Sequence, residues 1–191
     1  MEIYLIRHTA VAATGLCYGH YDVPLADTFA AEVVALRAKL PPAPPQGYHT
    51  YSSPAARCQA LATEFASVVT PDERLREMHF GAWENRAWND LPSTETAPWM
   101  ADYVTLAPPG GETFGAVQLR AAAFLAELAD GGAAGGPSPV LVFSHGGTIR
   151  ALVASCLEMP LRNAFQLRID FASITKIQRQ HGRWNLLTLN S

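Results

Sequence analysis

The sequence predicts a layered α/β fold built on a largely parallel sheet. The chain has 191 residues, of which 49% are hydrophobic and 16% are charged. A globular chain of this length buries a sizeable core without needing disulfides or a metal. Short apolar runs that are typical of buried strands alternate with stretches of helical period along most of the chain. That alternation is characteristic of helices packed in layers against a parallel sheet.

The individual elements follow from local patterns. The predicted strands are short, β-prone runs, in chain order 3–6, 49–52 and 140–143, followed by a C-terminal hairpin of 171–178 and 184–189 around His181-Gly182. The predicted helices have amphipathic spacing or strong start signals and cover 26–40, 54–69, 115–129 and a stretch that begins near Gly146. The prolines of 41–45 end the first helix, and the Gly/Pro-rich stretch 131–139 is expected to be a long surface loop.

Composition disfavours several classes of function. Fourteen basic against seventeen acidic residues give a net charge of −3, which is unusual for a domain that coats nucleic acid. Nowhere do 18 apolar residues run without a charge, so no membrane span is expected. The three cysteines, Cys17, Cys58 and Cys156, fit neither a disulfide framework nor a paired zinc motif, which favours a reducing cytoplasm. We expect no metal and no cofactor, and the sequence leaves the oligomeric state open.

Polar residues follow three of the predicted strands. The first strand ends in Arg7-His8-Thr9, the second in Ser52-Ser53-Pro54 with Arg57 beyond, and the third in Ser144-His145-Gly146-Gly147. In open α/β sheets, ligands bind outside the carboxyl ends of the strands. All three sets are therefore expected to face one crevice.

Two of these strand ends favour an anion. Ser53-Pro54 is a predicted helix start, with serine as N-cap and proline at the first helical position. Arg57 then lies in the first turn, where a cation opposes the helix macrodipole by about 0.3–1 kcal/mol. The turn at Gly146-Gly147 is expected to expose backbone N–H groups at a second helix N-terminus, which is another anion site.

In this combination and order, the sequence resembles the histidine phosphatase (phosphoglycerate mutase-like) superfamily. The matching residues are Arg7-His8, Ser52-Ser53-Pro54 with Arg57, Glu77 and His145-Gly146, and the resemblance runs from residue 2 to about residue 160. It implies a single three-layer α/β/α domain over residues 1–191, with a mixed, mainly parallel sheet of about six strands. Residues 86–109 have weak periodicity and are expected to form a cap over the strand ends.

Within the superfamily the chain is similar to the α-ribazole phosphatases of cobalamin assembly. The segments that carry this finer similarity are Cys17–Leu25, Leu75–Asn85, Pro108–Glu112 and His145–Leu152. The similarity implies metal-independent hydrolysis of a small phosphate ester, α-ribazole 5′-phosphate. The alternatives are a broad-specificity phosphatase, a phosphoglycerate mutase-like enzyme and a catalytically inactive phospho-ligand binding protein.

The chemistry of the residues agrees with this resemblance. Arg7 and Arg57 supply two permanent positive charges whose planar forks suit phosphoryl oxygens. The same cations lower the pKa of His8 and keep it neutral, as a nucleophile must be. The resemblance implies that His8 attacks phosphorus and that Glu77 protonates the leaving oxygen and then activates water. His145 and Gly146 complete the predicted phosphate-binding set.

Four residues depart from the pattern of the family, namely Thr9, Thr14, His79 and Asn85. They flank the predicted site without removing a catalytic group, so they bear on substrate choice rather than on the reaction. Substrate contacts are predicted for the loop after the nucleophile and for the aromatic residues of the cap, namely Thr14, Cys17, Tyr18, Trp88, Trp99 and Tyr103. Aromatic side chains are suited to stacking on a flat benzimidazole.

Overall fold

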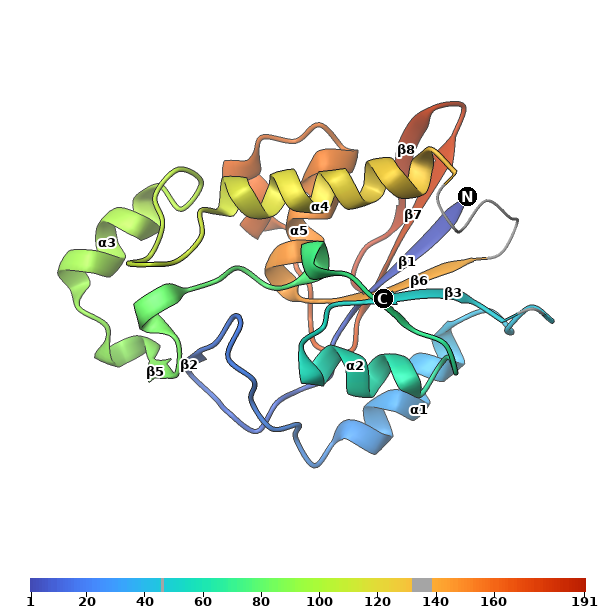
Figure 1. The fold of residues 1–191 in the computed structure, drawn as a ribbon, viewed down its shortest axis with the longest axis horizontal. Helices are drawn as coiled ribbons and strands as arrows, with labels where there is room; N and C mark the ends of the chain where they lie inside the picture. Colours follow the sequence, from blue (N-terminus) through green and yellow to red (C-terminus); the bar gives the residue numbers. More distant parts are fainter. Residues whose placement is uncertain (46, 132–138) are drawn as a thin grey trace.

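A six-stranded mixed sheet forms the centre of the molecule in the computed structural model, which describes residues 1–45, 47–131 and 139–191 (Figure 1). Its strands, in spatial order, are β4 (Thr70–Pro71), β3 (His49–Ser52), β6 (Val140–Ser144), β1 (Glu2–Arg7), β7 (Ile174–Gln180) and β8 (Arg183–Thr188). The first four run parallel, whereas β7 and β8 are antiparallel to their neighbours. The predicted mixed, mainly parallel sheet is confirmed.

Helices cover both faces of this sheet. Helices α4 (Phe114–Ala129) and α5 (Gly146–Cys156) lie on one face, and α1 (Phe29–Lys39) and α2 (Ala56–Thr63) on the other (Figure 1). Alternation along β1 produces the two cores, because successive side chains of a strand point to opposite faces. Ile3 and Leu5 pack in the cluster that contains α4 and α5, whereas Tyr4 and Ile6 pack with α1 and α2. The three predicted layers follow directly from this pattern.

Two predicted helices had wrong boundaries. The first helix begins at Phe29 rather than at residue 26, and the second runs only over Ala56–Thr63. Ala55 rather than Ser53 holds the N-cap position of α2, because the Ser53 hydroxyl lies 2.8 Å from the His145 ring. After Thr63 the chain turns back to pair as β4 at the edge of the sheet, which ends the helix early. Arg57 still lies in the first turn.

The C-terminal hairpin is confirmed, with its strand ends shifted by up to three residues. Strands β7 and β8 join through His181 and Gly182, whose φ angles of 51° and 77° lie in the left-handed region that a tight turn requires. Residues 171–173, which we had placed in the first strand of the hairpin, precede β7 instead. Of the predicted loop 131–139, residues 132–138 lie outside the described residues.

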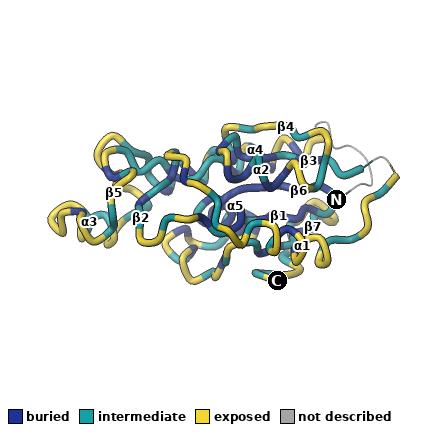
Figure 2. The backbone as a smooth tube through the Cα atoms, turned by 90° about the horizontal axis from the view of Figure 1, so that it is seen from below, coloured by how far each residue is buried: buried dark blue, intermediate teal, exposed yellow. Residues whose placement is uncertain are grey.

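A second, two-stranded sheet lies beyond the carboxyl ends of the central strands. It pairs β2 (Leu16–Cys17) with β5 (Arg86–Ala87), and the segment 86–109 continues through a 3₁₀ turn at Trp88–Asp90 into α3 (Ser93–Ala101). Figure 1 shows this part at the end of the molecule opposite the N-terminus. In Figure 2 the α3 end is largely exposed, whereas the buried backbone concentrates around β1, β6 and α5. No helix in the described part of the chain has the length and apolar character to cross a membrane.

Candidate active site

The carboxyl ends of β1, β6 and β3 lie level at one edge of the sheet. In the register of the parallel strands, Arg7 lies opposite Ser144 on β6, and Ser52 lies opposite Phe143. The residues that follow these strands therefore meet. The rings of His8 and His145 lie 5.2 Å apart in an edge-to-face arrangement.

The surroundings of His8 determine which of its ring nitrogens carries the proton. Its Nδ1 atom lies 2.8 Å from the Thr9 carbonyl oxygen, and since a carbonyl only accepts, Nδ1 carries the proton. The lone pair of the neutral ring is then on Nε2. Burial, followed by the charges of Arg57 and Arg7, holds the pKa of His8 well below its usual value of 6.5. The side chain is thus a neutral base with one free nitrogen.

His145 is fixed from both sides of its ring. An Nη2–H of Arg57 donates to its Nδ1 across 3.1 Å, so Nε2 carries the proton and donates to the Ser53 hydroxyl across 2.8 Å. Burial, followed by the charge of Arg57, holds the pKa of His145 well below its usual value. Ser53, which we had predicted as a helix cap, instead orients this histidine.

Arg57 is almost fully buried at 1% exposure, yet it is well supported. It donates to the carbonyl oxygens of Gly19 and Tyr21, at 2.7 and 3.2 Å, and lies 3.5 Å from the Asp22 carboxylate. Gly19 has to be glycine, because a Cβ there would lie 1.9 Å from the carbonyl oxygen of Met78. The loop after the nucleophile thereby becomes one wall of the arginine site.

Arg7 is anchored by the segment that precedes β7. Its Nη1–H donates to the Ile169 carbonyl across 2.8 Å, and its guanidinium carbon lies 3.7 Å from the centre of the Phe171 ring. The sequence analysis missed Phe171 because it had assigned that residue to a strand. The Nε groups of Arg7 and Arg57 are both buried without a hydrogen-bond partner. An unsatisfied buried donor costs about 1–3 kcal/mol, which a phosphoryl oxygen at this place would offset.

Glu77 occupies the helix N-terminus that we had predicted as a site for an external anion. The N–H groups of Gly147 and Thr148 donate to its two carboxylate oxygens, at 2.9 and 3.2 Å. The α5 macrodipole favours this negative charge. A Cβ on Gly147 would lie 2.4 Å from Oε1 of Glu77, so the second glycine of the motif makes room for the carboxylate. The prediction of an external anion at this helix N-terminus was wrong, because the carboxylate of Glu77 occupies it.

A cavity of about 140 Å³ opens beside Glu77 and Arg7. Glycines of the α5 N-terminus and mainly apolar side chains complete its lining, which consists of Arg7, Glu77, Met78, Phe80, Trp99, Tyr103, Phe114, Gly146, Gly147, Arg150 and Phe165. Trp99 and Tyr103 of the predicted cap are among them, whereas Trp88 is not and instead stacks against Trp99 with ring centres 6.1 Å apart. The phenylalanines and Arg150 were missed, because no local pattern in the sequence connects them to the strand ends.

The other predicted substrate contacts, Tyr18, Thr14 and Cys17, lie in three different environments. The Tyr18 ring centre is 5.1 Å from the Arg57 guanidinium carbon and 6.4 Å from the His8 ring, so Tyr18 borders the site. Thr14 is exposed in the loop that leads to β2. Cys17 is fully buried in a cluster with Trp83 and Leu91, and burial raises the pKa of its thiol to about 12. Its side chain therefore packs among these apolar residues and does not line the cavity.

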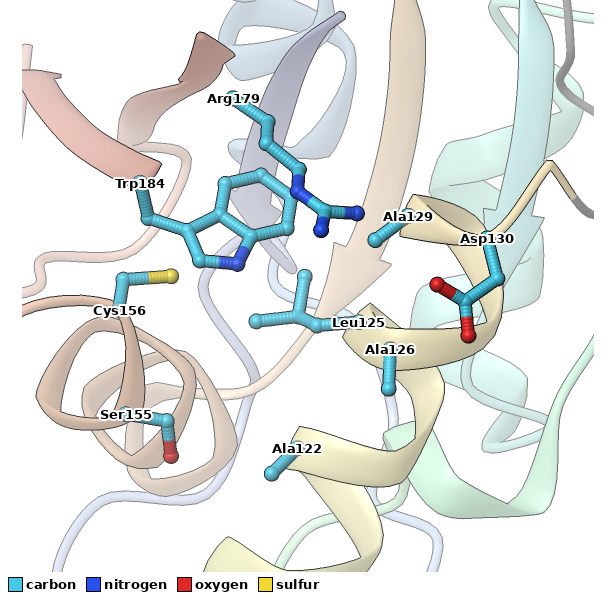
Figure 3. Close-up of a pocket in the computed structure, with 9 residues that line it drawn as sticks. All are labelled: Ala122, Leu125, Ala126, Ala129, Asp130, Ser155, Cys156, Arg179 and Trp184. Carbon is cyan, nitrogen blue, oxygen red and sulfur yellow. The ribbon is translucent and has the colours of Figure 1, made fainter. Parts of the chain in front are cut away.

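A second hollow in the described part of the chain lacks this combination of groups. This hollow, of about 270 Å³ between α4, α5 and the β7–β8 hairpin, is lined mostly by apolar side chains, with Arg179 and Asp130 at its rim (Figure 3). Neither histidine of the site is among its nine lining residues. Outside residues 46 and 132–138, no three His, Cys, Asp or Glu side chains are grouped so as to hold a metal ion.

The paired histidines, paired arginines and glutamate agree with a match to a known family. Residues 3–191 match the model of the histidine phosphatase superfamily, branch 1. The chain belongs to the histidine phosphatase superfamily. The predicted family and its phosphatase class are thereby confirmed.

This histidine phosphatase is similar to several named proteins and solved structures. The adenosylcobalamin/alpha-ribazole phosphatase of Salmonella typhimurium is 30% identical, over 100% of this chain and 96% of that protein. A glucosyl-3-phosphoglycerate phosphatase of Mycolicibacterium vanbaalenii is 32% identical over 85% of this chain and 76% of that one. The crystal structure of the alpha-ribazole phosphatase from Shigella flexneri superimposes with a TM-score of 0.89 at 28% identity, covering 100% of this chain and 96% of that chain.

Proposed function

We propose that this histidine phosphatase hydrolyses phosphate monoesters through a phosphohistidine on His8, and that its substrate is α-ribazole 5′-phosphate. One observation carries the proposal. The Nδ1–H of His8 is bound to the Thr9 carbonyl, so the lone pair of a neutral ring is on Nε2, beside two buried guanidinium groups with unpartnered donors. This is the arrangement that nucleophilic attack on a phosphoryl dianion requires.

In the first step, the Nε2 lone pair of His8 attacks phosphorus and the bond from phosphorus to the ester oxygen breaks. Protonated Glu77 gives its proton to the departing oxygen, which leaves as an alcohol. Arg7 and Arg57 stabilise the charge on the equatorial oxygens. His145 lies beside them, and its Nδ1 holds the Arg57 guanidinium group in place. These groups supply both charge stabilisation and proton transfer, so the step needs no metal.

In the second step, water attacks the phosphoryl group on His8. The Glu77 carboxylate takes a proton from that water, the bond from phosphorus to nitrogen breaks, and inorganic phosphate leaves with His8 neutral again. The hydrogen bonds from Gly147 and Thr148 hold the carboxylate in one position through both steps.

The choice of substrate rests on the aromatic cavity beside Glu77. We assign residues 86–109 as a cap, in which Trp99 and Tyr103 face the leaving group and Trp88 supports Trp99 from behind. A flat, apolar base such as benzimidazole suits this wall. Tyr18 borders the phosphoryl site from the opposite loop, and Gly146 contributes backbone at the start of α5. We place the enzyme in a reducing cytoplasm, because its three cysteines are free.

The substrate is tested by comparing kcat/KM for α-ribazole 5′-phosphate with that for 3-phosphoglycerate, in the presence of a chelator. We expect a preference of at least about tenfold, equivalent to roughly 1.4 kcal/mol. Comparable values would leave a broad-specificity phosphatase, and interconversion of phosphoglycerates would indicate the mutase alternative. Binding of these esters without turnover would indicate an inactive binding protein.

The nucleophile is tested by His8→Ala. Loss of the group that accepts phosphorus should cost several kcal/mol, so less than about a tenth of the wild-type rate on para-nitrophenyl phosphate should remain. Rapid acid-free quench of the wild type with labelled substrate should trap an acid-labile phosphate on His8. A variant with near wild-type turnover contradicts covalent catalysis by this residue.

A further inference from the structure

Arg150 is a half-buried cation that the proposed mechanism does not use. It lies in the second turn of α5, five residues after His145, and lines the cavity beside Glu77. Among residues 1–45, 47–131 and 139–191, no carboxylate oxygen lies within the 4.0 Å of an ion pair with its guanidinium group. Burial, followed by the charge of Arg7, lowers the pKa of Arg150. A charged group in this setting destabilises the fold unless a bound substrate group interacts with it.

Within the described residues, hydrogen bonds anchor the guanidinium group along one edge. Its Nε–H donates to the Leu167 carbonyl across 2.9 Å, and its central carbon lies 5.2 Å from the centre of the Phe165 ring. Nη1 lies against the start of α5, since a Cβ on Gly146 would be 3.0 Å from it. Nε is therefore occupied, while Nη1 lies beside Gly146, which also lines the cavity.

We propose that Arg150 is a specificity-determining residue whose Nη donors bind hydroxyl oxygens of a pentose ring on the leaving group. The inference rests on the proposed function, because it takes the cavity beside Glu77 to hold the leaving group. The ester oxygen has to meet Glu77, so the next atoms of the leaving group enter the cavity within reach of Arg150. A planar guanidinium fork suits two neighbouring oxygens.

Charge favours hydroxyl groups over a carboxylate as the partner. The cavity measures only about 140 Å³, and Arg7, Glu77 and Arg150 line it. A carboxylate on the leaving group would lie close to the phosphoryl dianion, and like charges at such distances repel. Hydroxyl oxygens accept from Arg150 without that repulsion. The aromatic wall of Trp99, Tyr103 and Phe165 then remains for the base beyond the sugar.

The test uses two esters that share a five-membered ring and a primary phosphate, namely ribose 5-phosphate and tetrahydrofurfuryl phosphate, which lacks the hydroxyls. We expect Arg150→Met to lower kcat/KM for ribose 5-phosphate at least about tenfold, the loss that goes with a hydrogen bond to a charged group, and to change it less than about twofold for the other ester. Arg150→Lys, which keeps the charge but not the fork, should fall between. Arg162→Met is the matched control, since Arg162 is exposed on the neighbouring 3₁₀ turn and does not line the cavity.

Equal losses on both esters in folded Arg150→Met or Arg150→Lys enzyme, or no loss on either, overturn the inference. A larger loss on 3-phosphoglycerate than on ribose 5-phosphate overturns the choice of hydroxyl groups in favour of a carboxylate. The wild-type enzyme also tests the inference without any variant. Its kcat/KM for ribose 5-phosphate should exceed that for tetrahydrofurfuryl phosphate by about tenfold. Equal hydrolysis of the two esters contradicts the role of Arg150 while the phosphatase stands, whereas hydrolysis of neither removes the proposed function and this inference together.

Discussion

Glu77 is proposed to act first as an acid and then as a base, and only esters with poor leaving groups need the acid. This dependence on the leaving group makes its role testable. We expect Glu77→Gln to lower kcat/KM for an alkyl phosphate by about 100-fold or more, because general acid catalysis of that size is lost. An activated aryl ester such as para-nitrophenyl phosphate leaves without a proton, so its kcat/KM should fall far less. The glutamine side chain keeps an oxygen for the N–H of Gly147 or Thr148, so the site should stay folded. Equal losses for the two leaving groups would remove Glu77 from the acid role.

Among whole elements, α4 positions the segment that carries Glu77. Arg120 of α4 donates to the carbonyl oxygens of Arg74, Arg76 and Glu77, at 2.7, 2.6 and 3.0 Å. It also donates to both oxygens of the Glu112 carboxylate, at 2.8 and 3.0 Å. One guanidinium group thus ties together the helix, the segment that leads to Glu77 and the loop before α4.

Replacement of this arginine should therefore affect both stability and catalysis. We expect Arg120→Met to reduce the free energy of unfolding by about 3 kcal/mol, since carbonyls and a half-buried carboxylate lose a charged donor. The remaining activity should be poorer on alkyl than on aryl phosphates, because Glu77 loses its support. Urea unfolding and the ratio of kcat/KM for the two esters measure these effects. Arg168→Met, which removes an exposed ion pair with Asp170, is the control and should stay within about 0.5 kcal/mol of the wild type. A similar small change for Arg120→Met would contradict the bracing role.

The proposed cap, residues 86–109, contributes to substrate preference and to packing, and these two contributions can be measured separately. Trp99 lines the cavity and Trp88 stacks behind it, so the two tryptophans form a matched pair. We expect Trp99→Leu to reduce the preference for α-ribazole 5′-phosphate over 3-phosphoglycerate by about two- to tenfold, the equivalent of one aromatic pair at 0.5–1.5 kcal/mol. Hydrolysis of para-nitrophenyl phosphate should be largely retained. Trp88→Leu should lower the melting temperature and leave the preference nearly unchanged, and identical effects of the two changes would assign both tryptophans to packing alone.

The molecule as a whole should lose stability as the pH falls below about 6.5. Burial, with the charge of Arg57 next, holds the pKa values of His8 and His145 well below the 6.5 at which both titrate in the unfolded chain. Below that pH the unfolded chain takes up protons that the native protein does not, so the stability present at neutral pH is lost until the native pKa values are reached. Two such groups correspond to a slope of at most about 2.7 kcal/mol per pH unit.

This slope is measured by urea unfolding at several pH values between 7.5 and 5. Carboxylates add their own contribution at the acid end, so the informative quantity is the difference between variants. We expect His8→Asn to reduce the slope by about 1.4 kcal/mol per pH unit just below pH 6, since it removes one histidine that the native state keeps neutral. An unchanged slope would mean that His8 takes up its proton in the native state as readily as in the unfolded chain.

The sequence alone determined the parts of this protein that local patterns encode. The continuous apolar run of β1 and the helical spacing in α1 and α4 predict the layers, because a strand that is apolar on both faces needs helices with apolar faces on each side of it. The order of strand ends predicts that Arg7, His8 and His145 meet, because parallel strands bring their carboxyl ends to one edge. The family followed from the same residues.

Only the tertiary structure decided what depends on groups far apart in the sequence. The Ser53 hydroxyl faces His145 instead of capping α2, and the α5 N-terminus receives Glu77 instead of an external anion. Phe171 supports Arg7, and Arg150 enters the cavity beside Glu77, although neither has a local pattern that sets it apart from core residues. In each case the partner of a polar group is chosen by distance in space, and the energy of a buried hydrogen bond or cation is too large for local propensity to override.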